Sequence, residues 1–188
     1  NMKNIKSYLI TDPNYFSDNK EIFKEKLIAV LKNHKIDFAC FRDKSSKNIE
    51  ELAKIFLQIC KEFKIKNILI NSNISLAIKL GFDGVHLNSQ QFDKIENAKK
   101  SKLITIISCH NLEELEKAMN KNIDFVTYSP IFDTPNKGES KGVDKLNEVI
   151  EKFPNLKIFA LGGIIQNEQI KEIEKTKAYG FASIRYFV

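Results

Sequence analysis

The chain contains little glycine and proline. Among its 188 residues there are seven glycines and four prolines, and no stretch rich in both interrupts the sequence. Such stretches commonly mark the linkers between domains. Without one, and with a length that suffices for one sizeable core, the sequence predicts a single domain over residues 2–188. Asn1 precedes Met2 and is interpreted as the remnant of an expression tag.

Cysteine is scarce as well. Cys40, Cys60 and Cys109 are far apart and show no CxxC spacing. An odd, scattered set argues against a disulfide framework and favours a reducing compartment. No cluster of cysteine and histidine has the spacing of zinc ligands either.

Long hydrophobic runs are missing. No stretch approaches the roughly 20 apolar residues that a membrane span requires. Residues 2–8 are polar and basic, unlike a signal peptide. We therefore expect a soluble, cytoplasmic protein that does not bind membranes.

The charge is of mixed sign along the whole chain. The net charge is +6, but lysines alternate with glutamates in stretches such as "KEIFKEKL" and "NLEELEKAMNK". Mixed charge of this kind is typical of solvated helix faces. Because no basic block or nucleic-acid-binding module is present, we expect no nucleic-acid partner.

What the chain does have is a regular alternation of short apolar runs and amphipathic helical stripes. Eight runs are predicted to be strands and seven stripes to be helices, in strict alternation. The predicted strands are 7–10, 36–42, 67–71, 84–88, 103–109, 124–129, 157–163 and 180–186, and the predicted helices are 19–34, 49–63, 74–81, 90–100, 112–121, 144–152 and 167–176.

Strict alternation of this kind implies a parallel sheet covered by helices. Eight units predict a closed (β/α)8 TIM barrel, here a minimal one that lacks the last C-terminal helix. An open doubly wound sheet is the alternative. In both folds a ligand binds where the strands end, so the βα junctions are where functional residues are expected.

Cationic side chains lie at or just after the ends of two of these predicted strands. Arg42 ends the second strand and Lys44 follows two residues later, so the two can share one side. Thr134 and Lys137 lie in the long loop after the sixth. Arginine and lysine at a strand mouth suit an oxyanion such as phosphate. A pair of surface charges bridged to Asp43 or Glu50 is the alternative for the first two.

A pair of glycines ends the seventh predicted strand. Gly162 and Gly163 lack the Cβ atoms that would keep a phosphate away from backbone N–H groups, and Arg185 lies near the end of the eighth strand. In barrels, the loops after strands seven and eight often bind phosphate. The sequence therefore predicts a phosphorylated ligand.

The remaining polar strand ends are less specific. Asn71 either binds a ligand or caps the next helix. Ser108 and His110 are two residues apart at the end of the fifth strand and can share one side. We expect His86, at the end of the fourth strand, to be a hydrogen-bonded scaffold residue rather than a catalyst.

Seven motifs in this order resemble the thiamine phosphate synthase/TenI superfamily over almost the whole chain. They are "YLITD" (8–12), "FRDK" (41–44), "ILINSN" (68–73), "LGFDGVHL" (80–87), "SCHNLEE" (108–114), "SPIFDTPNKG" (129–138) and "ALGGI" (160–164). The resemblance implies a TIM barrel, a role in thiamine biosynthesis and a thiazole phosphate ligand.

The resemblance also implies roles for single residues. Arg42 and Lys44 match a pair that binds pyrophosphate, and Gly162 and Gly163 match the cup for the thiazole phosphate. The other matches are the asparagine after strand three, a serine near the substrates and two residues of the strand-six loop, at Asn71, Ser108, Thr134 and Lys137.

The chain departs from the family pattern at its catalytic positions. Ser72 and Gln91 stand where the synthase has two magnesium-binding aspartates, and only Asp93 or Asp43 could replace them. Magnesium prefers carboxylate oxygens, so we predict no metal site from Ser72 and Gln91.

The TenI branch is altered too. Its catalytic histidine falls at Pro130, and Cys40 replaces a glutamine that binds the pyrimidine in the synthase. His110 and Cys40 are, by location, the nearest candidates for proton transfer.

These departures favour a TenI-like thiazole tautomerase, an isomerase that needs a general acid/base and no cofactor. The first alternative is a thiamine phosphate synthase, a transferase that joins hydroxymethylpyrimidine pyrophosphate to thiazole phosphate with Mg²⁺. The second is a binder of thiazole or thiamine phosphate without activity. The missing last helix also suggests a homodimer.

Overall fold

A computed structural model of the chain describes residues 5–188, so Asn1 and Met2 lie outside the described part. Its strands form one closed parallel barrel in chain order, β1 to β8. The barrel closes because β1 pairs with β2 on one side and with β8 on the other. The predicted TIM barrel is confirmed, and the open sheet is wrong. The strands are β1 (Lys6–Ile10), β2 (Phe38–Phe41), β3 (Asn67–Asn71), β4 (Gly84–Leu87), β5 (Ile104–Cys109), β6 (Phe125–Tyr128), β7 (Ile158–Leu161) and β8 (Gly180–Ser183).

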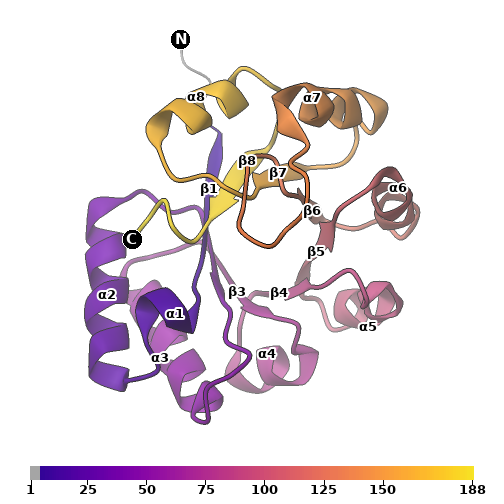
Figure 1. Cartoon of the computed structure of the whole chain (residues 1–188). Coiled ribbons are helices and arrows are strands. Elements are labelled where there is room, and N and C mark those ends of the chain that lie inside the picture. Colours follow the sequence, from indigo (N-terminus) through magenta and orange to yellow (C-terminus); the bar gives the residue numbers. More distant parts are fainter. Residues whose placement is uncertain (1–4) are drawn as a thin grey trace.

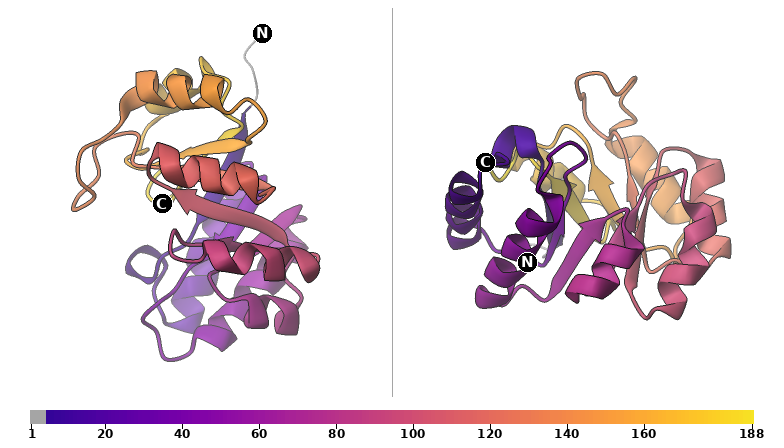
Figure 2. Two further views of the ribbon diagram at one scale, coloured as in Figure 1. Left: turned by 90° about the vertical axis from the view of Figure 1, so that its right-hand side faces the viewer. Right: turned by 90° about the horizontal axis from the view of Figure 1, so that it is seen from below.

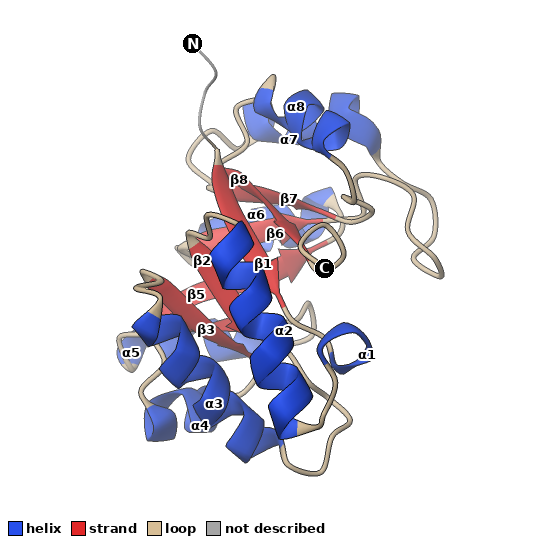
Figure 3. Cartoon of the chain, turned by 90° about the vertical axis from the view of Figure 1, so that its left-hand side faces the viewer, coloured by secondary structure: helices blue, strands red, loops and turns tan. Residues whose placement is uncertain are grey.

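Helices surround this barrel and follow one another around it (Figures 1 and 3). They are α1 (Pro13–Phe16), α2 (Lys20–Asn33), α3 (Ile49–Glu62), α4 (Ile74–Leu80), η1 (Phe92–Lys94), α5 (Ile95–Lys100), α6 (Leu112–Asn120), α7 (Gly142–Lys152) and α8 (Asn167–Glu174).

The predicted helices are present, with two differences. The short α1 was not predicted. It forms because Asp12 caps it by accepting a hydrogen bond from the Asn14 amide and because Pro13 suits a first helical position. The helix predicted at 90–100 begins as the 3₁₀ turn η1 and continues as α5.

Several strands are shorter than predicted, β8 most clearly. Its apolar run continues to Tyr186, but the strand ends at Ser183, whose hydroxyl oxygen accepts a hydrogen bond from the Tyr186 amide. The chain turns there and leaves the barrel. Apolar residues beyond the turn pack outside the sheet, so the hydrophobic run alone did not mark the strand end.

The strands are apolar on both faces because each face is buried. Inside the barrel, side chains from alternate positions form one cluster, which includes Tyr8, Phe38, Cys40, Leu69 and Phe159. A second, larger cluster lies between the sheet and the helices. The two clusters hold the strand ends, and the loops after them, in fixed positions.

No helix follows β8 in the described chain, as predicted. Phe187 is 5% exposed and stacks on Phe181 of β8, with ring centroids 5.9 Å apart. It also meets the ring of His34, at the end of α2, edge to face. The C-terminal residues thus cover part of the space beside β8 (Figure 1). Within residues 5–188, no helix is both long and apolar enough to cross a bilayer.

Candidate functional site at the carboxyl ends of the strands

The connections after the strands gather at one end of the barrel. The longest joins β6 to α7 over residues 129–141 and protrudes from the body of the molecule (Figure 2). Its base is fixed to β7, since the amides of Ile131 and Phe132 donate to the carbonyls of Leu161 and Gly162 at 2.9 and 3.0 Å. The loop therefore starts beside the glycine pair.

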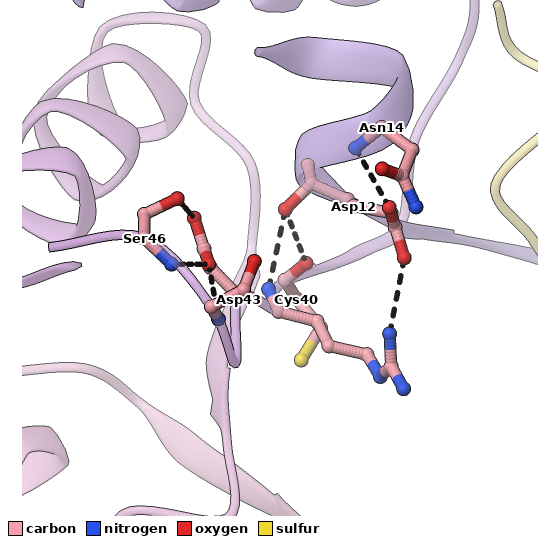
Figure 4. A network of polar contacts seen from close by, with 8 residues as sticks. Asp12, Asn14, Cys40, Asp43 and Ser46 are labelled. Carbon is pink, nitrogen blue, oxygen red and sulfur yellow. Dashed lines mark hydrogen bonds and ion pairs between the residues drawn. The ribbon is translucent and has the colours of Figure 1, made fainter. Parts of the chain in front are cut away.

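Arg42, after β2, is held by the loop after β1. Its Nη1 lies 3.1 Å from Oδ2 of Asp12, and its amide donates to the Thr11 hydroxyl at 3.2 Å. Asp12 also caps α1, so one carboxylate fixes both a helix start and a guanidinium (Figure 4). Arg42 is only partly buried and keeps further N–H groups for a ligand.

Lys44 is influenced by the charges of both Arg42 and Lys137, and these three residues are called the cationic group below. The Arg42 charge, with some desolvation and the Lys137 charge, lowers the pKa of Lys44 below its ordinary value. Mutual repulsion of this kind is relieved when an anion binds between the cations. The structure thus brings together cations from the second strand and the strand-six loop, 95 positions apart at Arg42 and Lys137.

A cavity of about 690 Å³ adjoins Lys44 on the side of β2, β3 and β4. Asn71 lies in its wall rather than at a helix cap, because Asn73 caps α4 by accepting from the Leu76 amide. The polar lining is rich in amides and hydroxyls, with two lysines and one carboxylate: Asp43, Lys44, Asn71, Ser72, Asn73, Ser75, Asn88, Gln91, Lys94 and Asn97.

The positions where magnesium ligands would be expected hold a hydrogen bond instead. Gln91 donates from Nε2 to the Ser72 carbonyl at 3.1 Å, and its Oε1 accepts from the Asn88 amide at 3.0 Å. Both polar ends of the Gln91 side chain are thereby used. The buried Ser72 hydroxyl has no partner, but it brings no charge.

Neither of the two replacement carboxylates is suitably placed. Both oxygens of Asp43 accept hydrogen bonds, from the amides of Ser45 and Ser46 and from the Ser46 hydroxyl (Figure 4). Asp93 is exposed on η1. Residues 5–188 contain no group of three or more His, Cys, Asp or Glu that could hold a metal ion. The residues present at this site therefore do not fit a bound magnesium ion.

The backbone conformation and the close packing of the loop after β6 both require glycine at positions 162 and 163, after β7. Gly162 and Gly163 have φ values of +108° and +70°, which side chains disfavour. A Cβ on Gly162 would lie 2.6 Å from Cα of Pro130, and one on Gly163 would lie 2.5 Å from the Asp133 carbonyl oxygen. The loop after β6 thus packs directly onto these two residues.

The same two residues leave donors available. Within the described chain, the amides of Gly162 and Gly163 donate no hydrogen bond. The Ser183 hydroxyl donates to the Ile164 carbonyl at 2.8 Å and so joins the loops after β7 and β8. Arg185, in the second of these loops, is partly buried and forms no ion pair with another described residue. These groups can receive a phosphate. The Thr134 hydroxyl is turned to the Phe132 carbonyl at 3.0 Å.

A chain of polar side chains crosses the barrel beneath the mouth. The Tyr8 hydroxyl of β1 lies 2.7 Å from Nδ1 of His86 of β4, and Nε2 of His86 lies 3.0 Å from the Ser108 hydroxyl of β5. Tyr8 and His86 are 0% and 4% exposed, whereas Ser108 is partly exposed. Burial, reinforced by the Arg42 charge, lowers the pKa of His86 to about 3, so its ring is neutral.

The two residues predicted as catalysts lie apart from each other. His110 is exposed, and its Nδ1 lies 3.2 Å from Oε1 of Glu114 on α6. Ser108 bonds to His86 instead, so Ser108 and His110 do not form one polar pair. Cys40 is fully buried inside the barrel, and burial raises the pKa of its thiol to about 12. The assignment of His110 and Cys40 as catalysts stays a prediction.

Comparison with known proteins shows the family of the chain. The family described as thiamine monophosphate synthase matches residues 7–187. The chain belongs to this family. A relative in Aquifex aeolicus, provisionally named thiamine-phosphate synthase 2, is 36% identical and covers 96% of both chains. Thiamine-phosphate synthase 1 of Streptococcus pneumoniae R6 is 31% identical over 77% of this chain and 72% of its own.

A solved structure supports the same membership of the thiamine monophosphate synthase family. It is the thiamine phosphate pyrophosphorylase from Pyrococcus furiosus, which is 25% identical and superposes with a TM-score of 0.81. The match covers 96% of this chain and 85% of that one. The predicted superfamily is thus confirmed.

Sequence reasoning missed two features of this family member. Asp12, which orients Arg42, lies 30 positions before it, and Tyr8 lies 78 positions before its partner His86. The one usable signal is strand alternation, which places Tyr8 and Ile10 on the same face of β1. It gives no indication of the partner across the barrel.

Proposed function

We propose that this chain is a transferase that joins a hydroxymethylpyrimidine diphosphate to a thiazole phosphate, the synthase reaction that the family resemblance implies. The names of its relatives, thiamine-phosphate synthase and thiamine phosphate pyrophosphorylase, support the proposal. One observation supports the proposal: two separate sets of groups that can receive an anion follow strands at the same end of the barrel. The first is the cationic group of Arg42, Lys44 and Lys137. The second is formed by the free amides of Gly162 and Gly163. A reaction between two phosphorylated substrates needs both, whereas a tautomerase acting on one phosphorylated substrate needs one.

In this proposal the cations act on the leaving group. The carbon–oxygen bond to the diphosphate breaks, and its electron pair leaves with the diphosphate. The nitrogen of the thiazole then donates its lone pair to the pyrimidine cation, and a carbon–nitrogen bond forms. Arg42 and Lys44 stabilise the charge that develops on the diphosphate, and the glycine amides hold the thiazole phosphate in place. Because the residues at the Ser72 and Gln91 positions do not fit magnesium, no step is assigned to a metal.

A synthase assay tests the proposal. Purified protein is incubated with both substrates, with and without magnesium, and thiamine phosphate is measured by mass spectrometry. We expect product, and we expect Arg42→Gln to lower kcat/KM about 100-fold because a charged donor to the leaving group is lost. Lys100→Gln is the matched control, since Lys100 is exposed on α5 and, among residues 5–188, forms an ion pair with Glu96 alone. The absence of product at high protein concentration would refute the proposal.

The second candidate function is the thiazole tautomerase, which needs no metal. The hydrogen bond from Gln91 to Ser72, in place of metal-binding carboxylates, favours it. Its test is conversion of the thiazole carboxylate phosphate tautomer, with His110→Ala and Cys40→Ala as the variants that should lose activity. Ligand binding with neither activity would instead select the role of a non-catalytic binder. A homodimer stays a prediction, and sedimentation tests it.

A further inference from the structure

The Ser108 hydroxyl has one hydrogen-bond partner among the described residues and can form a further hydrogen bond. Within the described chain its side-chain hydrogen bond is to His86, at 3.0 Å. Thr127 is in register with Ser108 on β6, yet its buried hydroxyl has no partner, so Ser108 does not bond to it. Since Ser108 is partly exposed, its remaining hydrogen-bonding capacity is available to a ligand.

Which atom Ser108 offers to that ligand depends on the tautomer of His86. A neutral imidazole has one N–H donor and one acceptor nitrogen. A phenol is a better donor than acceptor, and a neutral imidazole nitrogen is a strong acceptor. The Tyr8 hydroxyl, 2.7 Å from Nδ1, therefore donates to it. The ring proton is then on Nε2 and is donated to the Ser108 oxygen.

We infer that Tyr8 and His86 are positioning residues that hold the Ser108 hydroxyl as a hydrogen-bond donor toward the diphosphate of the substrate. Since Nε2–H occupies an oxygen lone pair, the Ser108 proton is free to point away from His86. A donor in this direction suits a negatively charged oxygen. Arg42 comes two residues after Cys40, which lies in the same interior cluster as Tyr8, so by strand alternation Arg42 is on the side of β2 that faces the barrel mouth. The inference rests on the proposed function for the identity of the ligand.

The relay is rigid, which is what positioning requires. Tyr8 packs against Phe38 and Phe159 inside the barrel, with ring centroids 5.9 and 5.1 Å away. Its ring also stacks on that of His86, at 5.7 Å and 29°. Neither ring can turn without disturbing the interior cluster. The Ser108 hydroxyl is therefore oriented before the ligand arrives.

A double-mutant cycle with inorganic pyrophosphate as the probe tests this. Dissociation constants are measured by calorimetry, and circular dichroism verifies folding. Loss of one hydrogen bond corresponds to about tenfold weaker binding. We expect Ser108→Ala and His86→Leu each to raise the dissociation constant of pyrophosphate about tenfold. The double variant should also raise it about tenfold rather than about a hundredfold, because both substitutions remove the same contact.

Conservative variants separate positioning from structural support. His86→Gln keeps an N–H near the Nε2 position and should bind pyrophosphate within about twofold of the original chain, whereas Tyr8→Phe should weaken binding about threefold. Tyr179→Phe is the matched control, since Tyr179 packs on Phe38 and Phe159 in the same interior but makes no side-chain hydrogen bond among the described residues. It should leave binding unchanged. If His86→Leu does not fold, the Gln and Phe variants decide.

Nitrogen-15 spectra of labelled histidine provide a readout that needs no ligand. We expect the proton of His86 on Nε2 in the original chain and a mixture of tautomers in Tyr8→Phe. A proton on Nδ1, additive effects in the cycle, or no binding of pyrophosphate would each overturn the inference. If the Ser108 and His86 substitutions are coupled but the protein has no synthase activity, the proposed function alone is refuted. If their effects on binding are additive in a protein that has synthase activity, the inference alone is refuted.

Discussion

At the scale of single residues, neighbouring charges set the behaviour of Lys44. The Arg42 and Lys137 charges and some desolvation favour its neutral form and lower its pKa. A bound diphosphate favours the charged form. Binding above the pKa of free Lys44 is therefore coupled to uptake of a proton.

We predict that pyrophosphate binding weakens as the pH rises through the lowered pKa of Lys44. The decline should start at a lower pH than for a lysine of ordinary pKa, because the free chain loses this proton early. Lys137→Gln removes one neighbouring charge and should move the decline to higher pH. Calorimetry across the alkaline range measures both. Lys44→Arg should bind without this decline, since arginine stays charged; an unchanged profile in that variant would rule out Lys44 as the source.

His86 links a single side chain to the stability of the fold. Burial lowers its pKa from 6.5 to about 3, so between these values the unfolded chain binds a proton that the folded chain does not. Stability therefore rises with pH across this window. The contribution is fully present above pH 6.5 and is lost as the pH falls toward 3.

We predict that His86→Gln flattens the dependence of unfolding free energy on pH between about 3 and 6.5. The free energy is measured by urea denaturation at a series of pH values. Part of the slope should persist, because desolvation also lowers the pKa of His34. A slope identical to that of the original chain would mean that His86 is protonated equally in both states.

At the scale of elements, the loop after β6 and the turn after β7 form one unit. Backbone hydrogen bonds join them, and Pro130 and Asp133 lie against glycines that have positive φ. The path of the loop that carries Lys137 therefore depends on the absence of side chains at positions 162 and 163.

We predict that Gly162→Ala destabilises the protein by about 2–3 kcal/mol, since it adds a steric clash to a backbone conformation that alanine disfavours. Gly138→Ala is the matched control. Gly138 also has a positive φ, +76°, but a Cβ there would have no atom within 4 Å, so we expect a cost of about 1 kcal/mol. Chemical denaturation measures both, and equal costs would mean that the contact with Pro130 is unimportant.

At the scale of the whole molecule, the barrel is closed by hydrogen bonds between β1 and β8, and apolar residues cover the outside of that seam. Phe187 is one of them, packed on Phe181 and on His34 of the α2 end. A few residues after β8 thus bury apolar surface beside the last strand.

We predict that Phe187→Ala lowers the unfolding free energy by about 2 kcal/mol, the value of removing one buried phenyl ring where solvent can enter the space. Val188→Ala, at a position that is 53% exposed, should change it by less than about 0.5 kcal/mol. Urea denaturation compares the two variants. A cost for Phe187→Ala as small as the control's would show that the seam is stable without this contact.

The sequence by itself determined the alternation of strands and helices, the barrel and the family. Apolar periodicity is local, so it reports which segments are strands and which face each residue takes. It also placed Arg42, Lys44, Lys137, Gly162 and Gly163 at or after the carboxyl ends of strands, because the order of elements decides on which end of a barrel each loop lies.

Only the tertiary structure decided which residues of the site contact one another. Asp12 meets Arg42, Tyr8 meets His86, and Gln91 bonds to Ser72, and in each pair the two residues come from different strands or the connections after them. From the sequence, Gly162 and Gly163 were expected to leave space for a phosphate. In the structure the backbone of Pro130 to Asp133 lies directly against them. The physical reason is that such contacts depend on the register of eight strands around a closed ring, and local periodicity carries no information about that register.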